Sequence, residues 1–124
     1  EEVRDALQQA MDAALGNVPV LDGRVVLCPD VSGSMGSSVT GYRKGATSVV
    51  RCIDVAGLMS AAFLQRNPNA RVMPFEYDVV DVRLNRRDSV MTNAEKLAKI
   101  GGGGTNCSAP LAKLANEHAR VDLV

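Results

Sequence analysis

Residues 24–36 read RVVLCPDVSGSMG, and this stretch decides how the rest of the chain is interpreted. The run at 24–28 is strand-like and apolar on both sides of the pleat, as expected for a central strand covered by helices on both faces. Asp30, Ser32 and Ser34 then follow at every second position. Their side chains share one direction on an extended segment, and in a loop leaving the strand they can converge on a single point.

The sequence on either side predicts alternating helices and strands. Residues 1–15 carry apolar side chains at three- and four-residue intervals, the pattern of an amphipathic helix that Gly16 ends. After the Gly/Ser-rich loop 32–48 we expect a largely buried helix over 49–66, strands over 70–77 and 78–84 joined by a tight turn, helices over 89–100 and from about Ser108, and the start of a strand at 120–124. Such alternation predicts an α/β fold with a mainly parallel sheet and helices on both faces.

Composition bounds the class of protein. The chain has 124 residues, 46% hydrophobic and 23% charged, with a formal net charge of zero, as expected for one globular, soluble domain. Three arginines at 83–88 are interpreted as part of a solvated loop, since a basic stripe that would indicate nucleic acid is missing.

The sequence also bears on membranes and on the cellular compartment. Apolar runs fall short of the ~20 residues of a membrane span, and the acidic N-terminus argues against a signal peptide. An odd number of cysteines, Cys28, Cys52 and Cys107, favours reduced core thiols in a cytoplasmic protein.

Two loops are candidates for a metal site, because ligands of parallel sheets bind at the carboxyl ends of the strands. Asp30, Ser32 and Ser34 offer only oxygen, which suits Mg²⁺ or Mn²⁺. Thr105 is a second source of oxygen, preceded by four glycines that let the backbone approach closely and followed by a helix start. A cation held mainly by neutral hydroxyls keeps much of its charge, so we expect it to bind an acidic side chain or a phosphate without catalysis.

These motifs resemble a known site. DVSGSM at 30–35, with GGGGTNCSAPL about 70 residues later, is similar to the metal-ion-dependent adhesion site of von Willebrand factor type A domains. The resemblance implies a Rossmann-like type A fold, with a mostly parallel sheet, one antiparallel edge strand and helices on both faces. It assigns Asp30, Ser32, Ser34 and Thr105 to the metal. The family's third motif, an aspartate beyond the next strand, has no match, and Asp122 lies at the wrong end of its strand for that role.

Longer segments narrow the resemblance. Residues 14–35, 54–79 and 101–114 are similar to the C-terminal domain of Ro ribonucleoproteins, the TROVE-module family. In that family a ring of helical repeats binds Y RNAs and the ends of defective noncoding RNAs, and the type A domain joins the ends of the ring. The resemblance implies that residues 1–22 are a connector or the end of that ring, and that 23–124 are a partial type A domain. Small noncoding RNA is then a partner of the parent protein.

Alternatives remain open at this level. Ser32 and Ser34 can cap a turn while Asp30 caps a helix. The type A domain can also belong to an unrelated adaptor or metal-chelatase assembly that binds a partner's acidic side chain.

Other candidate sites compete with simpler interpretations of the same residues. A nucleotide-binding loop is disfavoured because neither glycine-rich phosphate pattern occurs. Core packing is favoured for Cys107 over a reactive thiol, and a surface position for His118. Candidate contacts to RNA or a partner near the metal are Tyr42, Arg43 and Lys44, which a solvated loop explains equally well.

Overall fold

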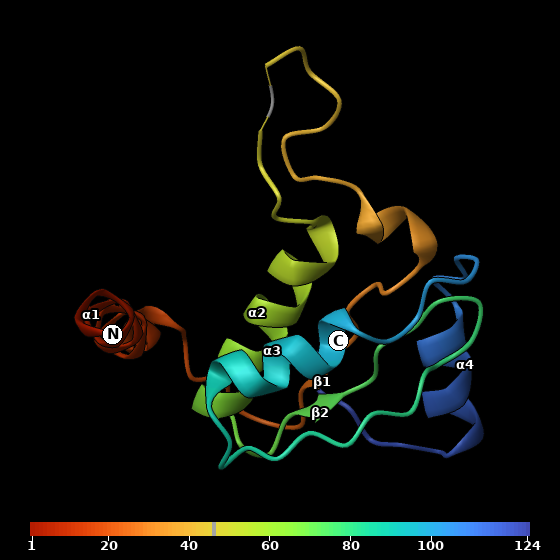
Figure 1. The fold of residues 1–124 in the computed structure, drawn as a ribbon. Coiled ribbons are helices and arrows are strands. Elements are labelled where there is room, and N and C mark those ends of the chain that lie inside the picture. The colour runs from red at the N-terminus through yellow and green to blue at the C-terminus, as the bar shows by residue number, and fades with distance from the viewer. Residues whose placement is uncertain (46) are drawn as a thin grey trace.

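A computed structural model describes residues 1–45 and 47–124 (Figure 1). In chain order the elements are α1 (Glu2–Ala14), the 3-10 helix η1 (Leu15–Asn17), β1 (Val26–Leu27), the 3-10 helix η2 (Gly33–Gly36), α2 (Cys52–Arg66), β2 (Arg71–Val72), α3 (Val90–Ala98) and α4 (Ala109–Asn116). The predicted alternation of helices and strands is therefore confirmed.

The strands run side by side in parallel. Val26 pairs with Arg71 and Leu27 with Val72, and single parallel bridges extend the pairing from Asp30 to Phe75 and from Val25 to Leu123. The chain crosses from β1 to β2 through α2, the connection expected of a parallel α/β unit. β1 thus lies between β2 and the segment around Leu123, which makes it the central strand that its apolar sequence predicts.

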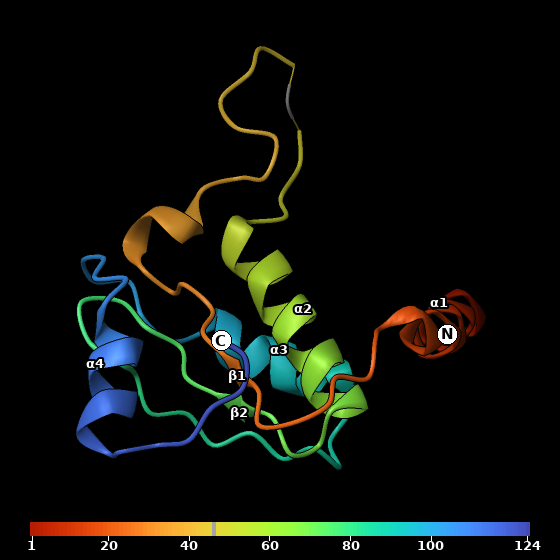
Figure 2. The ribbon, with the colours of Figure 1, turned by 180° about the vertical axis from the view of Figure 1, so that it is seen from behind.

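Helices cover both faces of this small sheet. On one face, α4 contributes Leu114 to a buried cluster with Val26 and Met73. On the other, α2 packs against α3, and Figures 1 and 2 show this pair on the side of the strands opposite α4. The predicted layers of helix, sheet and helix are therefore present.

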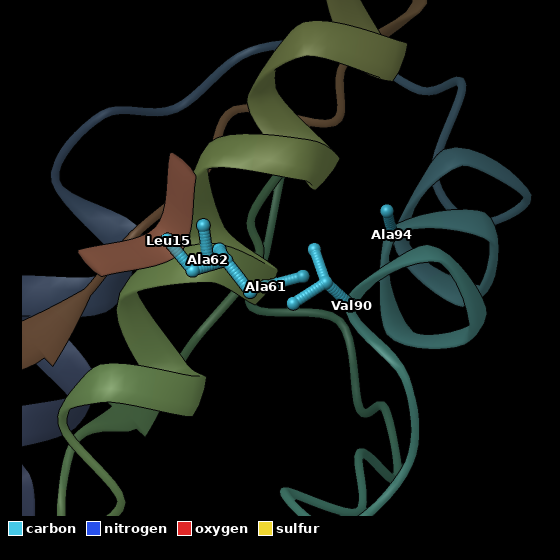
Figure 3. Close-up of a cluster of buried hydrophobic side chains, with 5 residues drawn as sticks. All are labelled: Leu15, Ala61, Ala62, Val90 and Ala94. Atoms are coloured by element: carbon cyan, nitrogen blue, oxygen red, sulfur yellow. The ribbon is translucent and has the colours of Figure 1, made fainter. Parts of the chain in front are cut away.

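A second cluster joins the N-terminal segment to the α2–α3 pair. Leu15 of η1 packs beside Ala62 and Ala61 of α2, and these lie toward Val90 and Ala94 of α3 (Figure 3). Helix α1 itself has no buried residue, so its amphipathic pattern is confirmed as a helix but its apolar face is left largely uncovered in the described chain. The segment packs on the α2–α3 pair through Leu15, with Met11 and Val18 beside it.

The sequence overestimates the regular structure between β2 and α3. The predicted strand over 78–84 is wrong beyond a single antiparallel bridge, Phe75 to Val79, so the expected antiparallel edge is reduced to that bridge. Val80 N–H donates to the Pro74 carbonyl at 2.8 Å, but proline has no N–H with which to continue a ladder. The chain reversal near Tyr77 is confirmed.

Two other predicted boundaries shift. Helix α2 begins at Cys52 rather than at 49, because the Asp54 carboxylate accepts the Arg51 backbone N–H at 2.8 Å and Ser38 bridges Arg51 in antiparallel fashion. The strand expected at 120–124 is present only as the bridge of Leu123 to Val25.

Candidate metal centre

The segment that carries Asp30 is fixed by the end of the neighbouring strand. Phe75 donates its N–H to the Pro29 carbonyl at 3.0 Å and accepts the Val31 N–H at 2.8 Å. These two bonds continue the parallel pairing one step past the regular strands. Asp30 therefore stands at the carboxyl edge of the sheet, where ligands of α/β proteins bind.

The two serine hydroxyls face each other. Ser32, only 2% exposed, places its Oγ 3.4 Å from Oγ of Ser34. Adjacent ligands of an octahedral Mg²⁺ with bonds near 2.1 Å lie about 3.0 Å apart, so this spacing fits two ligands of one ion. Neither hydroxyl caps a backbone group within the described residues.

Asp30 makes a local hydrogen bond within the turn. Its Oδ1 accepts the Ser32 N–H at 2.8 Å, closing an Asx-type turn. Asp30 therefore closes a turn instead of capping a helix, and the capping alternative also fails for the serine hydroxyls within the described residues. The other carboxylate oxygen has no hydrogen bond to the part of the chain that the structure describes, and it remains available to water or an ion.

The glycine-rich loop packs directly onto this turn, as Figures 1 and 2 show for η2 and the loop after α3. Gly33 donates its N–H to the Gly103 carbonyl at 2.9 Å, and Gly102 donates to the Val31 carbonyl at 2.9 Å. A Cβ added at Gly33 would lie 2.9 Å from the Gly102 carbonyl oxygen. The glycines therefore allow two backbones to touch at the place where the sequence predicts that the two motifs meet.

Thr105 is held just beyond this contact. It is exposed, two residues after Gly103, and Asn106 after it donates its N–H to the Glu76 carbonyl at 2.7 Å. The Asn106 side chain accepts hydrogen bonds from both the N–H and the hydroxyl of Ser108. Ser108 directly precedes α4, close to where the sequence predicts that the helix begins. The start of α4 is thereby tied to the loop that carries Thr105.

Glu76 is the residue of this region that sequence reasoning misses. Its Oε2 accepts the Gly103 N–H at 2.8 Å, so the side chain of one strand end reaches the glycine-rich loop. A signal was present in the sequence: Glu76 follows the strand next to β1, and the rule that pointed to Asp30 applies equally to that strand end.

The donors available for an ion are mainly neutral. Within residues 1–45 and 47–124, no three acidic, histidine or cysteine side chains gather into a group that could hold a metal. Burial raises the pKa of the Cys28 thiol, which outweighs the opposite effect of the Arg71 guanidinium, so that thiol stays protonated at neutral pH. A hard cation here would depend on hydroxyl oxygens, carboxylate and water, as Mg²⁺ accepts.

Other singled-out residues lie away from the two loops or face solvent. The core position expected for Cys107 is wrong: it is exposed, because the bonds of Asn106 to Glu76 and Ser108 turn the chain outward at this point. His118 is exposed just past α4, as predicted, with a positive φ of 50°. Asp122 accepts the Arg24 N–H at 2.7 Å, which places it at the amino end of β1, away from the loops that carry Asp30 and Thr105.

A protruding loop follows η2. Its two arms are joined by hydrogen bonds from Cys52 N–H to the Ser37 carbonyl and from Val39 N–H to the Val50 carbonyl. Beyond them the chain projects from the body of the molecule in both ribbon views. Tyr42, 97% exposed, and the exposed Arg43 and Lys44 lie on this loop, so they are accessible to a partner but are not part of the serine turn.

The structure combines a parallel sheet covered by helices with a D-x-S-x-S turn at the carboxyl edge of that sheet. The turn touches the glycine-rich loop that precedes Thr105. This combination defines the von Willebrand factor type A class of domain. Comparison with known families is specific: the Ro60 vWA domain family matches residues 24–124. The chain belongs to that family.

Related proteins agree with this assignment. The chain is 32% identical over 120 residues to the RNA-binding protein RO60 of Deinococcus radiodurans, covering 97% of this chain and 22% of that protein. The crystal structure of the Ro (RSR) protein of the same organism superposes with a TM-score of 0.73 at 31% identity, covering 98% of this chain and 24% of that one. The chain thus spans about a quarter of the length of these relatives.

Among the described residues, none of the helices combines the length and apolar character required to cross a membrane.

Proposed function

We propose that this chain is a non-catalytic, divalent-metal-dependent binding module. Ser32, Ser34 and Thr105 would bind Mg²⁺ or Mn²⁺ directly, and Asp30 would bind it directly or through water. The observation that carries the proposal is the backbone contact of Gly33 with Gly103, which brings the two motif loops together. The 3.4 Å spacing of the serine hydroxyls supports it.

The bound cation would supply positive charge for an anionic group, an acidic side chain or a phosphate. The chain's own part is to hold a few oxygens at a rigid sheet edge while leaving most of the ion's charge uncompensated. No histidine supports general-base chemistry at this place, since His118, the only histidine of the sequence, follows the far end of α4. A binding role therefore fits better than an enzymatic one.

The biological setting that we propose is an RNA-binding Ro-like protein. The parent would bind Y RNAs and misfolded small noncoding RNAs through a helical-repeat ring, with this module joined to that ring, in the cytoplasm, where free thiols such as the three described here stay reduced. Support comes from the family match and from the relative named an RNA-binding protein. The competing function is an adaptor domain whose metal binds a partner protein's carboxylate.

Calorimetric titration with Mn²⁺ tests the metal site. The wild-type chain should bind one Mn²⁺, and Ser32→Ala and Thr105→Ala should each lower the affinity at least about 10-fold, because each removes a direct ligand. Thr92→Ala is the matched control, because it removes an exposed hydroxyl on α3 that contacts the Ser89 hydroxyl, and affinity should stay within about twofold.

Two outcomes decide between the functions. Equal binding by wild type and both ligand variants would reject the site. If binding holds, an RNA oligonucleotide and a glutamate-rich peptide are titrated onto the Mn²⁺-loaded chain, and preference for the peptide would favour the adaptor function.

A further inference from the structure

Glu76 lies where the two loops of the proposed metal site meet, namely the turn with Asp30, Ser32 and Ser34 and the glycine-rich loop that leads to Thr105. It directly follows Phe75, whose backbone is bonded to Pro29 and Val31 on either side of Asp30. Its own N–H donates to the Asp78 carbonyl at 2.9 Å, within the chain reversal after β2. The backbone of Glu76 is therefore fixed relative to Asp30 before its side chain makes any contact.

The same residue contacts the glycine-rich loop twice. Its side-chain Oε2 accepts the Gly103 N–H at 2.8 Å, and its carbonyl accepts the Asn106 N–H at 2.7 Å. Thr105 lies between these two anchored positions. From this geometry we propose that Glu76 is the positioning residue of the metal site, setting where Thr105 stands relative to the Asp30 turn.

The side-chain bond matters because of what it holds. Residues 101–104 are all glycine, and glycine loses more conformational freedom on ordering than any other residue. The carboxylate of Glu76 fits closely, since a Cβ added at Gly103 would lie 2.9 Å from its Cδ. Without this acceptor, the Gly103 N–H would lose its partner and the approach to Thr105 would be less ordered.

Two other roles for Glu76 make different predictions. As a metal ligand or a source of negative charge it would act through its ionised carboxylate, whereas as a positioning residue it acts through a hydrogen-bond acceptor. Glutamine keeps an acceptor oxygen at nearly the same place and removes the charge. Glu76→Gln and Glu76→Ala therefore separate positioning from charge.

The test combines Mn²⁺ calorimetry with hydrogen exchange of the Gly103 amide by NMR. This inference rests on the proposed metal site, but the exchange is measured without metal. Glu76→Ala should weaken Mn²⁺ binding about 10-fold, as outer-shell substitutions do, and speed exchange of the Gly103 N–H at least about 10-fold. Glu76→Gln should keep both within about threefold of wild type. Glu95→Ala, which removes an exposed carboxylate on α3, is the charge-matched control and should change neither.

Each contrary result has one meaning. Equal loss of affinity in the Gln and Ala variants would overturn positioning in favour of charge or ligation. Unchanged Gly103 exchange in Glu76→Ala would show that the bond does not order the loop, and would also overturn the proposal. Absence of Mn²⁺ binding by wild type would reject the proposed function, and the exchange data would still decide whether Glu76 orders the loop.

Discussion

Gly101 occupies a position that no other residue can take without rearrangement. Its φ is +85°, and a Cβ there would overlap the carbonyl oxygen of Val31, the residue between Asp30 and Ser32. Positive φ favours glycine, and the overlap adds a steric clash with backbone. The glycine-rich loop can therefore approach the serine turn only because residue 101 has no side chain.

Substitution at this glycine should destabilise the chain. We expect Gly101→Ala to lower the free energy of unfolding by about 1–3 kcal/mol, measured by urea denaturation. Gly36→Ala is the control, because a Cβ there meets nothing within 4 Å and its φ is not positive, so stability should stay within about 1 kcal/mol. Equal effects of the two substitutions would contradict the steric argument.

At this scale the sequence predicts the motif residues but not their bonds. Spacing and strand placement lead to Asp30, Ser32 and Ser34, since alternation is visible in one dimension. The role of Glu76 depends on which backbone N–H its carboxylate meets, and that is set by a reversal at Tyr77 whose geometry the sequence shows only roughly. Cys107 is misplaced for a similar reason, because the bonds of Asn106 decide which way it points.

Among the elements, α4 is attached to the sheet near its C-terminal end, by packing and by an ion pair. Leu114 packs on Val26 and Met73, and beyond the helix Glu117 accepts two hydrogen bonds from the Arg71 guanidinium, at 2.6 and 3.1 Å. The hydrogen bonds from Arg71 hold the pKa of Glu117 below its ordinary value of 4.5. This ion pair links the amino end of β2 to the C-terminal end of α4. The other end of α4 adjoins the loop that carries Thr105.

A lowered carboxyl pKa fixes the sign of a pH dependence. Because Glu117 is more acidic in the folded chain, its contribution to stability is present above pH 4.5 and is lost as the pH falls through its lowered folded pKa. We expect a small loss of stability in Glu117→Gln at pH 7, seen as a lower urea midpoint, since exposed pairs contribute little. The difference from wild type should vanish at low pH, and a difference that persists in acid would assign the effect to packing.

Element types along the chain are predictable and their lengths are not. Apolar patterning finds the four α-helices of the described chain, including α1, whose apolar stripe is visible in the sequence although none of its residues is buried. Strand lengths depend on partners distant in sequence: Pro74 ends the ladder with the segment from 78, and Ser38 pairs with Arg51 to delay the start of α2. Neither pairing has a local signal.

Across the whole molecule, charge is balanced and anion binding must therefore be local. The formal net charge is zero, so no general field attracts a polyanion. The protruding loop leaves directly from η2, and its exposed Arg43 and Lys44 carry two positive charges on the part that projects from the body of the molecule (Figures 1 and 2). The loop therefore presents two local positive charges that a phosphate can reach.

The proposed RNA-binding role gives a testable salt dependence for this loop. If Arg43 and Lys44 each neutralise one phosphate, their replacement by alanine should reduce the slope of log affinity against log salt by about 1.4, at about 0.7 per contact with a single strand. Fluorescence anisotropy with a short single-stranded RNA, at constant Mg²⁺ and varied KCl, measures this slope.

In the same assay, Tyr42→Ala should weaken RNA binding by about 1–3 kcal/mol if the ring stacks on a base, with little change in the slope of log affinity against log salt.

The matched control removes two charges elsewhere. Arg86 and Arg87 are exposed on the 83–88 loop, which lies at the end of the molecule away from the protruding loop in both ribbon views. Their replacement by alanine changes net charge by the same amount, so a purely global effect would reduce the slope equally in both double variants. A reduction confined to the Arg43 and Lys44 variant would instead locate the phosphate contacts on the protruding loop, because salt-dependent affinity reports only the charges that displace counterions from the bound strand.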